Sequence, residues 1–579
     1  MAAHGRKWKH RALVCLGLAA YVLPSTGEDD RAVAQTDCGG VVGSFDAARG
    51  WSVFQGIPYA MPPTGSRRWL RSELLSEGNG CWTGLYDATS EPTSCAQGPF
   101  FNYITGKVSW HGEEDCLTVD VRSTMSHLSG GLLQPVLANI HGGSLVAGSP
   151  DPMTGFRDHG IVIVGIRYRL NVLGFLALEE LSAHDSLGVS GNYGFSDQIT
   201  ALRWIQRNAR AFGGDPSRVT IIGCSSGGTS IWNLLSSPLS RGLFSAVIAL
   251  SSASRNNVTL KQAESDNRIF ANRACGSTSH AKDRYQCLKG LSLEQVMAGF
   301  LYMNYNFPFW SHPDFELPTA SEYQSGLAIV DGVVIPTALQ LALQTHGLHM
   351  HVPVLVGSCS QEGRTSWLRE DATVADFEAA IAKFVADLGT ASWPRDAAAR
   401  ISQLYPPNAS EFGGQPKTAL DSMIADIRVV CGTTYNAQRL VAGRSPGVPA
   451  SAVDVWQYYS DLRATSLGRV GHCHTLVTLS EGNTSGWPAT DRAYHRNMIR
   501  VHSTFIKTGA PPAGTLWRLG SLGSFAAGDY ALNDLNAEMT VSKSRLRERC
   551  EFWRETRVLE QYAWDEFSAP LPPDAWIAV

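Results

Sequence analysis

Short runs of consecutive apolar residues recur through the middle of the chain, and segments with helical spacing lie between them. Each run is typical of a buried strand. In residues 196–211, Ile199, Leu202 and Ile205 have the spacing of one helix face, and the Gly213-Gly214 pair ends this segment. The alternation predicts an α/β fold with a mostly parallel central sheet and helices on both faces. The runs are residues 135–140, 161–166, 219–222, 246–250, 353–358 and 452–459.

The pattern changes before and after this alternation. Residues 38–70 contain short alternating runs separated by Gly and Pro, which predict an antiparallel start. Residues 255–345 are less regular, and we interpret them as a helical and loop insertion over the edge of the sheet that carries the site. The aromatic residues within 302–310 either pack in a core or line an apolar gorge, and the sequence leaves both alternatives open. We expect residues 35–579 to form one domain.

The N-terminus has the layout of a secretory signal peptide. Four basic residues between positions 6 and 11 precede an apolar run at 12–23, which Pro24 ends. This run is too short to span a bilayer comfortably. We therefore expect cleavage after Gly27, so that residues 1–27 are removed and the protein is secreted without a stable membrane anchor. Cleavage near 32–34 and an uncleaved anchor are the alternatives.

Composition and charge narrow the class of protein further. The formal net charge is −4 and no basic face is apparent, which argues against a nucleic-acid partner. Twelve cysteines favour an oxidising compartment. Because Cys15 leaves with the predicted signal peptide, at least one of the remaining eleven is unpaired. Secretion would make Asn257, Asn408 and Asn483 candidate glycosylation acceptors.

The apolar run at 219–222 leads into the sequence Gly223-Cys224-Ser225-Ser226-Gly227. A helical segment follows, so the motif Gly-x-Ser-x-Gly lies between a strand and a helix, as a nucleophile elbow requires. Glycines on either side leave room where a Cβ would clash. The turn would present the hydroxyl of Ser225 at a helix N-terminus, where the N–H of Ser226 can help to hold an oxyanion. A chance match is the alternative, because the chain is rich in Gly and Ser.

A second glycine loop lies upstream of this serine. The apolar run at 135–140 ends at His141-Gly142-Gly143-Ser144. Glycine allows backbone N–H groups to approach a ligand closely. In a fold with a nucleophile elbow, a loop of this kind supplies further oxyanion donors.

An activated serine needs a base, and the base needs an orienting acid. Glu362 lies on a turn after a buried strand, and His474 lies on a loop after a later strand. The order Ser225, Glu362, His474 is the chain order serine, acid, histidine that goes with a nucleophile elbow. Solvent exposure is the alternative for the glutamate, and a surface or core position is the alternative for the histidine. His472, two residues away, is a rival base.

Six further segments occur in a characteristic order before the serine motif. They are residues 54–60, 114–117, 166–175, 191–194, 197–204 and 212–216. Together with the serine motif, they resemble the type-B carboxylesterase, lipase and cholinesterase family of α/β-hydrolases. The resemblance covers nearly the whole chain after the predicted signal peptide. It implies the α/β-hydrolase fold and ester hydrolysis without a metal or an organic cofactor.

The resemblance implies a catalytic role for three residues. Ser225 matches the nucleophile of the family. Glu362 matches the acid of the family's Gly-Ser-x-x-Asp-Glu-Gly turn, and His474 matches the histidine of a Gly-x-x-His motif that begins at Gly471. The oxyanion hole would be formed by the loop at Gly142, Gly143 and Ser144 together with Ser226.

The resemblance also implies the disulfides Cys95–Cys116 and Cys275–Cys287, and we add Cys38–Cys81 and Cys431–Cys550 as further hypotheses. The chain departs from the family at several positions near the serine. Cys224 replaces a usual glutamate, and we expect it to be an uncharged buried thiol. The departures are Cys224, Ser144, Ser226, Leu145 and Val477.

We therefore expect a secreted serine carboxylic-ester hydrolase that acts on a small-molecule or lipid ester. The alternative is a non-catalytic, cholinesterase-like adhesion or binding protein. His472-Cys473-His474 lacks the spaced partner residues of a metal site. The sequence leaves the pairing of Cys224, Cys359 and Cys473, the acyl and alcohol groups of the substrate, and the oligomeric state open.

Overall fold

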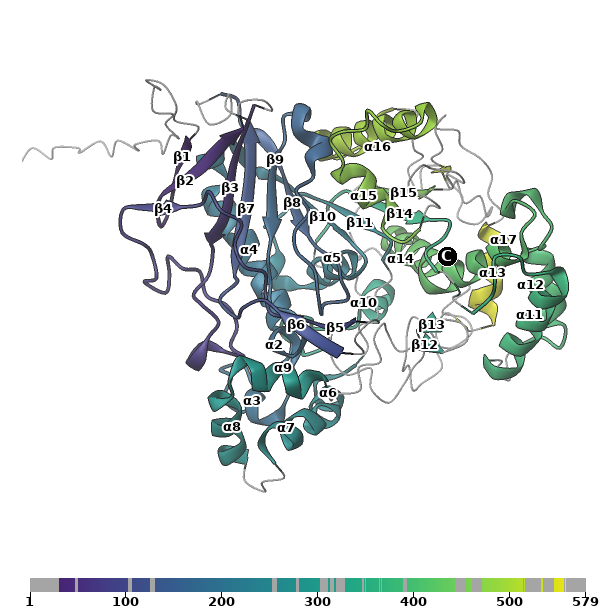
Figure 1. Ribbon diagram of the computed structural model, residues 1–579, viewed down its shortest axis with the longest axis horizontal. Coiled ribbons are helices and arrows are strands. Elements are labelled where there is room, and N and C mark those ends of the chain that lie inside the picture. The colour runs from purple at the N-terminus through teal and green to yellow at the C-terminus, as the bar shows by residue number, and fades with distance from the viewer. Residues whose placement is uncertain are drawn as a thin grey trace, which may run out of the picture.

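The computed structural model shows an α/β architecture built on one large mixed sheet (Figure 1). The predicted signal peptide, residues 1–27, and the aromatic segment 302–310 lie outside the described residues. The structure describes residues 31–46, 50–102, 107–124, 131–252, 258–276, 281–301, 311–312, 317–318, 328–345, 348, 350–363, 365, 367–388, 393–442, 454–460, 471–513, 515, 533–534, 546–556 and 558.

The sheet has the order β1-β2-β3-β7-β9-β8-β10-β11-β14-β15-β16, and β4 pairs with β2. Successive neighbours from β1 to β9 are antiparallel, as the alternating runs near the N-terminus predict. From β9 to β16 all neighbours are parallel. The strands are β1 (Arg31–Thr36), β2 (Gly39–Asp46), β3 (Trp51–Pro58), β4 (Leu85–Asp87), β7 (Thr118–Thr124), β8 (Gln134–Ile140), β9 (Val162–Ile166), β10 (Gly214–Cys224), β11 (Ala246–Leu250), β14 (Val354–Cys359), β15 (Val455–Ser460) and β16 (Asn533–Asp534).

Alternate residues of the central strands face two different cores, because side chains alternate across a sheet. In β10, Ile221 packs with apolar side chains of α4, α5, α10 and α14 on one face. Its neighbour Ile222 packs with η2, α15 and α16 on the other face. The central strands are therefore apolar on both faces, which explains their continuous apolar runs.

Two further groups of helices have cores of their own. One group, α11 to α13 with η6 and α17, lies beyond β15 in Figure 1. A second group, α3 and α7 to α9, lies below the sheet in the same view and packs on α2. The α-helices of the described residues are α2 (Asn171–Phe175), α3 (Glu179–Ser182), α4 (Tyr193–Asn208), α5 (Ser226–Ser236), α6 (Leu260–Asp266), α7 (Arg268–Cys275), α8 (Ala281–Gly290), α9 (Leu293–Leu301), α10 (Leu339–Thr345), α11 (Val374–Leu388), α12 (Ala397–Leu404), α13 (Pro416–Ala425), α14 (Cys431–Ala442), α15 (His474–Ser480), α16 (Ala489–Thr508) and α17 (Leu546–Glu555).

Short elements complete the connections. A π-helical turn continues α13, and two small hairpins lie outside the main sheet. The short elements are η1 (Gly65–Arg67), η2 (Thr154–His159), η3 (Ala209–Phe212), η4 (Pro238–Ser240), η5 (Ser410–Phe412), the π-helical η6 (Asp426–Val430), the hairpin β5 (Gln97–Asn102) with β6 (Lys107–His111), and the hairpin β12 (Ser311–His312) with β13 (Leu317–Pro318).

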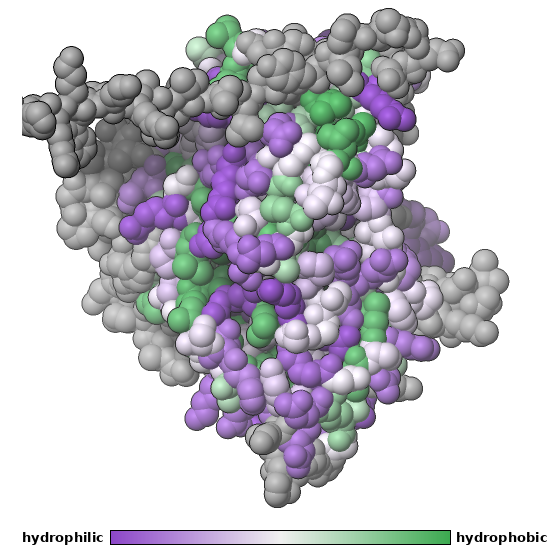
Figure 2. Space-filling view, turned by 90° about the vertical axis from the view of Figure 1, so that its left-hand side faces the viewer, coloured by the Kyte–Doolittle hydropathy of each residue, from purple (hydrophilic) through white to green (hydrophobic). Residues whose placement is uncertain are grey.

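The side of the molecule that carries β1, β2 and β4 has small hydrophobic areas separated by hydrophilic residues (Figure 2). The buried residues Ala32 and Ala34 of β1 alternate with more exposed ones along the strand, so these two side chains point into the core. In the part of the chain that the structure describes, helices long and apolar enough to cross a membrane are absent.

Candidate active site

Ser225 lies at the turn between β10 and α5, with φ 59° and ψ −127°. Such a conformation costs on the order of 1–3 kcal/mol for a residue with a side chain. A Cβ on Gly223 would lie 2.5 Å from the Gly227 carbonyl, and a Cβ on Gly227 would lie 2.2 Å from the Ile140 carbonyl oxygen. Only glycine fits at both positions. The N–H of Ser225 donates to the Leu250 carbonyl at 3.0 Å, which fastens the elbow to the carboxyl end of β11.

The loop after β8 lies against this elbow. A Cβ added to Gly142 would be 3.2 Å from the Cβ of the elbow serine. The N–H of Leu145 donates to the Oγ of Ser226 at 3.1 Å, so a side chain that departs from the resembled family ties the loop to α5. The N–H groups of Gly143 and Ser144 make no hydrogen bond to another described residue. These groups are therefore available to a ligand at the elbow.

The segment after β9 supports the loop from behind. The Tyr168 hydroxyl donates to the His141 carbonyl at 2.8 Å, and the N–H of Asn171 donates to the Leu145 carbonyl at 2.7 Å. The rings of Tyr168 and His141 stack with centroids 4.4 Å apart. Burial lowers the pKa of His141 to about 4, so this imidazole is neutral at pH 7. His141 is thus a structural member of the loop.

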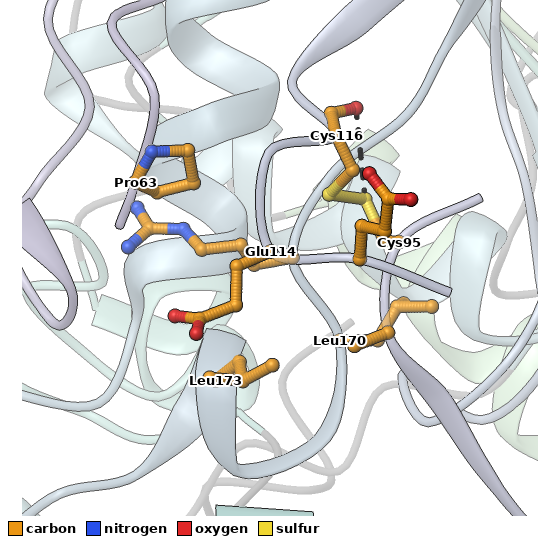
Figure 3. Close-up of a pocket in the computed structure, with 9 residues that line it drawn as sticks. Pro63, Cys95, Glu114, Cys116, Leu170 and Leu173 are labelled. Carbon is orange, nitrogen blue, oxygen red and sulfur yellow. Dashed lines mark hydrogen bonds between the residues drawn. A yellow bond between two sulfur atoms is a disulfide. The ribbon is translucent and has the colours of Figure 1, made fainter. Parts of the chain in front are cut away.

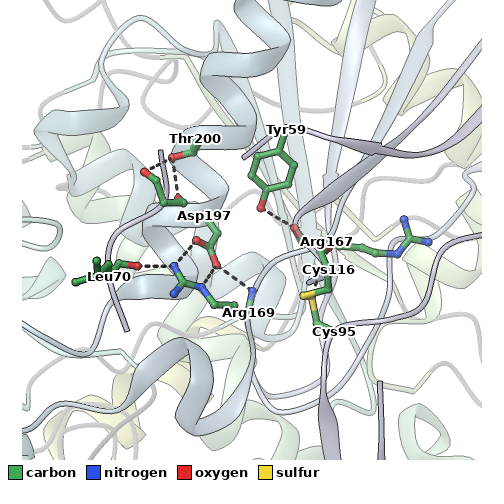
Figure 4. A network of polar contacts seen from close by, with 9 residues as sticks. Tyr59, Leu70, Cys95, Cys116, Arg167, Arg169, Asp197 and Thr200 are labelled. Carbon is green, nitrogen blue, oxygen red and sulfur yellow. Dashed lines mark hydrogen bonds and ion pairs between the residues drawn. A yellow bond between two sulfur atoms is a disulfide. The ribbon is translucent and has the colours of Figure 1, made fainter. Parts of the chain in front are cut away.

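A buried ion pair fixes the supporting segment in turn. The Arg169 guanidinium donates to both carboxylate oxygens of Asp197, at 2.8 and 2.7 Å, and to the Leu70 carbonyl at 2.9 Å. Asp197 also accepts the backbone N–H of Arg169 (Figure 4). The Tyr59 hydroxyl donates to the Arg167 carbonyl at 2.8 Å. Because these contacts connect α4 and the N-terminal strands to one segment, the glycine loop after β8 rests on a rigid base.

Glu362 lies three residues beyond β14, and its side chain is fully buried. Its Oε1 accepts the backbone N–H of Cys359 at 2.7 Å. The preceding residue, Gln361, pairs with Gly471 in a parallel bridge. This bridge brings the loop after β14 beside the segment that leads into α15.

His472 follows Gly471 and faces Glu362. Its Nδ1 lies 2.7 Å from the Oε2 of Glu362, and its side chain is 34% exposed. When Nδ1–H donates to the carboxylate, Nε2 is the nitrogen that can accept a proton. This is the acid–histidine pairing of a serine hydrolase triad.

The contact that we expected between Glu362 and His474 is made by His472 instead. His474 is the first residue of α15, and its ring packs 6.1 Å from the Tyr494 ring. Burial lowers the pKa of His474. The reason is the left-handed backbone of Cys473, with φ 61°, which turns the chain between the two histidines. A count of residues from Gly471 contains no information about this turn.

Cys224 and Cys473 form a disulfide. The expectation of a buried thiol at Cys224 is wrong, although the disulfide is equally uncharged. A signal for the contact of His472 with Glu362 was present in the sequence, since a cysteine adjoins Ser225 and another adjoins His472. Pairing these two cysteines would have pointed to His472. Among the described cysteines, Cys359 is a buried free thiol.

Four more disulfides lie away from the elbow. They include both pairs that the resemblance implied and both pairs added as hypotheses. Five disulfides among the described residues agree with an oxidising compartment. The four are Cys38–Cys81, Cys95–Cys116, Cys275–Cys287 and Cys431–Cys550.

A small cavity lies beside the Cys95–Cys116 disulfide, with Glu114, Leu170 and Leu173 in its lining (Figure 3). Glu114 forms a buried ion pair with Arg68, whose Nε donates to Oε2 at 2.6 Å. The carboxylate is thus already neutralised within the protein. The lining contains no residue of the elbow or of the Glu362 turn, so we assign the candidate active site to the elbow. Among the described residues, no group of three metal-binding side chains is found.

Comparisons with known proteins find similar chains that include esterases. Human cocaine esterase (Homo sapiens) is 32% identical over 380 residues, which are 62% of this chain and 62% of that protein. Esterase FE4 of Myzus persicae is 29% identical over 505 residues, 82% of this chain and 84% of that protein. Neurotactin of Drosophila melanogaster is 30% identical over 463 residues, 76% of this chain and 49% of that protein.

The match thus spans less than two thirds of the length of cocaine esterase. The model of the carboxylesterase family matches residues 30–553. That range includes the elbow, the glycine loop after β8, Glu362 and His472, on a large mixed sheet covered by helices. The chain therefore belongs to the carboxylesterase family and has the α/β-hydrolase fold.

Proposed function

We propose that this protein is a serine carboxylic-ester hydrolase with Ser225 as nucleophile, His472 as general base and Glu362 as orienting acid. The observation that carries the proposal is the 2.7 Å contact between His472 Nδ1 and the buried Glu362 carboxylate. The strained elbow at Ser225 supports it independently. The base is His472 in place of the histidine that the motif spacing favoured.

The reaction follows from these roles. Ser225 Oγ attacks the ester carbonyl carbon while Nε2 of His472 takes the hydroxyl proton. Glu362 keeps the proton of Nδ1 in place and stabilises the imidazolium. Collapse of the tetrahedral intermediate breaks the bond to the alcohol, which leaves with the proton from His472. Water then attacks the acyl-enzyme by the same route and releases the carboxylic acid.

The negative charge of the tetrahedral intermediate needs backbone donors. The N–H groups of Gly143, Ser144 and Ser226 are the candidates, with Gly142 providing the close approach of the loop to the elbow. Loss of one such donor typically lowers kcat by about 100- to 1,000-fold. The contact from Leu145 to Ser226 supports this assignment, because it holds the two halves of the hole together.

The substrate class that we propose is a carboxylic ester of a small molecule or a lipid. The names of the relatives, which include a cocaine esterase and an esterase, support ester substrates. Cys224 and its partner carry no charge beside the nucleophile. We infer that the site does not require a charged substrate.

The test is labelling with a fluorophosphonate probe together with turnover of p-nitrophenyl acetate. The wild-type protein should be labelled and active. Ser225→Ala should lose the label and about a million-fold in kcat, the loss typical of a serine nucleophile. Circular dichroism should be unchanged. Ser149→Ala, which removes an exposed hydroxyl near the oxyanion loop, is the matched control and should keep both signals.

Two results would contradict the proposal. Labelling of Ser225→Ala at the wild-type level would place the nucleophile elsewhere. A folded wild-type protein that neither reacts with the probe nor turns over esters would favour the non-catalytic adhesion or binding protein.

A further inference from the structure

The Cys224–Cys473 disulfide joins loops that are 249 residues apart in the sequence. Cys224 directly precedes Ser225, and Cys473 directly follows His472. Consecutive Cα atoms are about 3.8 Å apart. A covalent bond between the two neighbours therefore limits how far the base can move from the nucleophile.

Besides the bridge from Gln361 to Gly471, a small number of hydrogen bonds hold the segment that carries His472. The N–H of Cys473 donates to Ser251 Oγ at 3.3 Å, and the N–H of His474 donates to the Gly471 carbonyl at 3.0 Å. The His472 ring is one-third exposed, and Glu362 is its described side-chain partner. These are single hydrogen bonds, each worth about 1 kcal/mol. The disulfide is the strongest connection of this segment to the sheet.

Both ends of the disulfide attach at the carboxyl end of β11. Ser225 N–H bonds to the carbonyl of Leu250, and Cys473 N–H bonds to the next residue, Ser251. Ser251 N–H in turn donates to the Gly357 carbonyl at 2.8 Å, on the strand that leads to Glu362. The disulfide thus closes a ring of contacts through all three proposed catalytic loops.

A third cysteine, Cys359, lies next to these contacts and does not compete for the Cys224–Cys473 disulfide. The Sγ of Cys359 is 3.9 Å from Ser251 Oγ and 4.0 Å from Thr475 Oγ1. Burial raises the pKa of Cys359 to about 12. Disulfide exchange requires a thiolate, and Cys359 remains a thiol at neutral pH. Reduction of the pair accordingly depends on an external thiol.

We propose that Cys224–Cys473 is a positioning disulfide that holds His472 in register with Ser225, and that its reversible reduction lowers turnover. The proposal rests on the proposed esterase function. It goes beyond that function because it assigns a role to a covalent bond that the triad chemistry does not use.

The redox step is an ordinary thiol–disulfide exchange. Cys473 is more exposed than the buried Cys224. A thiolate of dithiothreitol therefore attacks the Sγ of Cys473, and Cys224 leaves as a thiolate. The second thiol of dithiothreitol then attacks the mixed disulfide and closes its own cyclic disulfide. The protein gains two electrons and two protons, and both cysteines become thiols. The loop of His472 is then held by hydrogen bonds alone.

The first experiment replaces both cysteines of the pair, so that neither is left behind as an unpaired thiol. Cys224→Ser/Cys473→Ser should lower kcat on p-nitrophenyl acetate by about 10- to 100-fold, the effect of a misplacement near 1 Å. KM should change by less than about three-fold, because the oxyanion loop and the elbow are intact. Assays run well below the melting temperature of the variant separate positioning from a general loss of stability.

The matched control removes a disulfide that is remote from the elbow. Cys275→Ser/Cys287→Ser opens a loop between α7 and α8. Its kcat should remain within about two-fold of the wild-type value. Equal losses of kcat in the two variants, or wild-type kcat in Cys224→Ser/Cys473→Ser, would overturn the proposal.

The second experiment uses the wild-type protein and stays informative if the double variant does not fold. Folded protein is titrated with dithiothreitol, and alkylation with mass spectrometry follows each cysteine. The loss of kcat should track alkylation of Cys224 and Cys473 and should reverse on reoxidation. A loss that tracks another pair, full activity with this pair reduced, or a pair that stays oxidised until unfolding would each overturn it.

Failure of the esterase function would look different. The oxidised wild-type protein would then show neither turnover nor fluorophosphonate labelling. Failure of the disulfide proposal leaves both of those signals in place and affects only the response to reduction and to the double substitution.

Discussion

At the scale of single residues, two histidines separated by one cysteine have different environments. His472 is one-third exposed and contacts the buried carboxylate of Glu362. His474 is buried at the start of α15 against Tyr494, and burial lowers its pKa. Proton transfer requires a base that a substrate can reach and that an acid orients. Only His472 meets both conditions.

We expect His472→Gln to lower kcat by at least about a thousand-fold, since it removes the proposed base. The matched variant His474→Gln should keep kcat within about ten-fold and should instead lower the free energy of unfolding, because it changes a buried ring. Steady-state kinetics and denaturant unfolding of both variants check this. The reverse pattern of kcat values would return the role of base to His474.

At the scale of elements, the strand-to-helix turn at Ser225 depends on close contact between β10, β8 and α5. Gly223 and Gly227 lie so near to each other and to Ile140 that neither has space for a methyl group. The apolar residues of β10 alternate between two cores, which fixes the register of the strand that ends at the elbow. The position of the nucleophile is thus a consequence of backbone packing.

Gly227→Ala should destabilise the fold by about 3 kcal/mol, because its Cβ would lie 2.2 Å from a backbone carbonyl oxygen that cannot move aside. Gly290→Ala is the control. Its Cβ would point into open space at the end of α8, and the substitution should change stability by less than about 0.5 kcal/mol. Urea unfolding midpoints provide the measurement. Equal stability of the two variants would show that the elbow tolerates a side chain.

At the scale of the whole molecule, the helices beyond β15 form a second core with a polar centre. The Tyr405 hydroxyl donates to Asp426 Oδ2 at 2.7 Å, and Trp553 Nε1 donates to Tyr405 at 2.8 Å. Arg549 contacts the rings of Tyr405 and Phe412. Burial raises the pKa of Asp426 from 3.8 to about 6, and the charge of Arg549 opposes part of this shift. The stability of this core should therefore depend on pH.

The sign follows from proton binding. Between pH 4 and 6 the folded protein retains a proton on Asp426 that the unfolded chain has lost, so the contribution of Asp426 to stability falls as pH rises through this window. Asp426→Asn removes this dependence. Its stability relative to the wild type should increase by about 3 kcal/mol from pH 4 to above pH 6. Thermal or urea unfolding across this range measures the difference.

The exposed Asp283→Asn is the control for this measurement and should parallel the wild type. A difference between Asp426→Asn and the wild type that is the same at pH 4 and pH 7 would show that Asp426 titrates normally in the folded protein.

Several features could be predicted from the sequence because short-range physics decides them. Continuous apolar runs predict strands buried on both faces, and β8, β9, β11, β14 and β15 each overlap one of these runs. The glycines around Ser225 predict a tight turn because only glycine lacks a Cβ. The positions of the elbow and of the Glu362 turn along the chain could also be predicted, because each directly follows a buried strand.

The tertiary structure alone decided which side chains meet across the sheet. His472 and His474 lie two residues apart, and the motif spacing favoured His474, but the left-handed φ of Cys473 determines which of them faces Glu362. The bond from Cys224 to Cys473 and the contact from Leu145 to Ser226 each join loops on different strands. Such pairings depend on strand order and register, which arise only when the whole sheet is assembled. A local sequence pattern contains no information about contacts with residues far away in the chain.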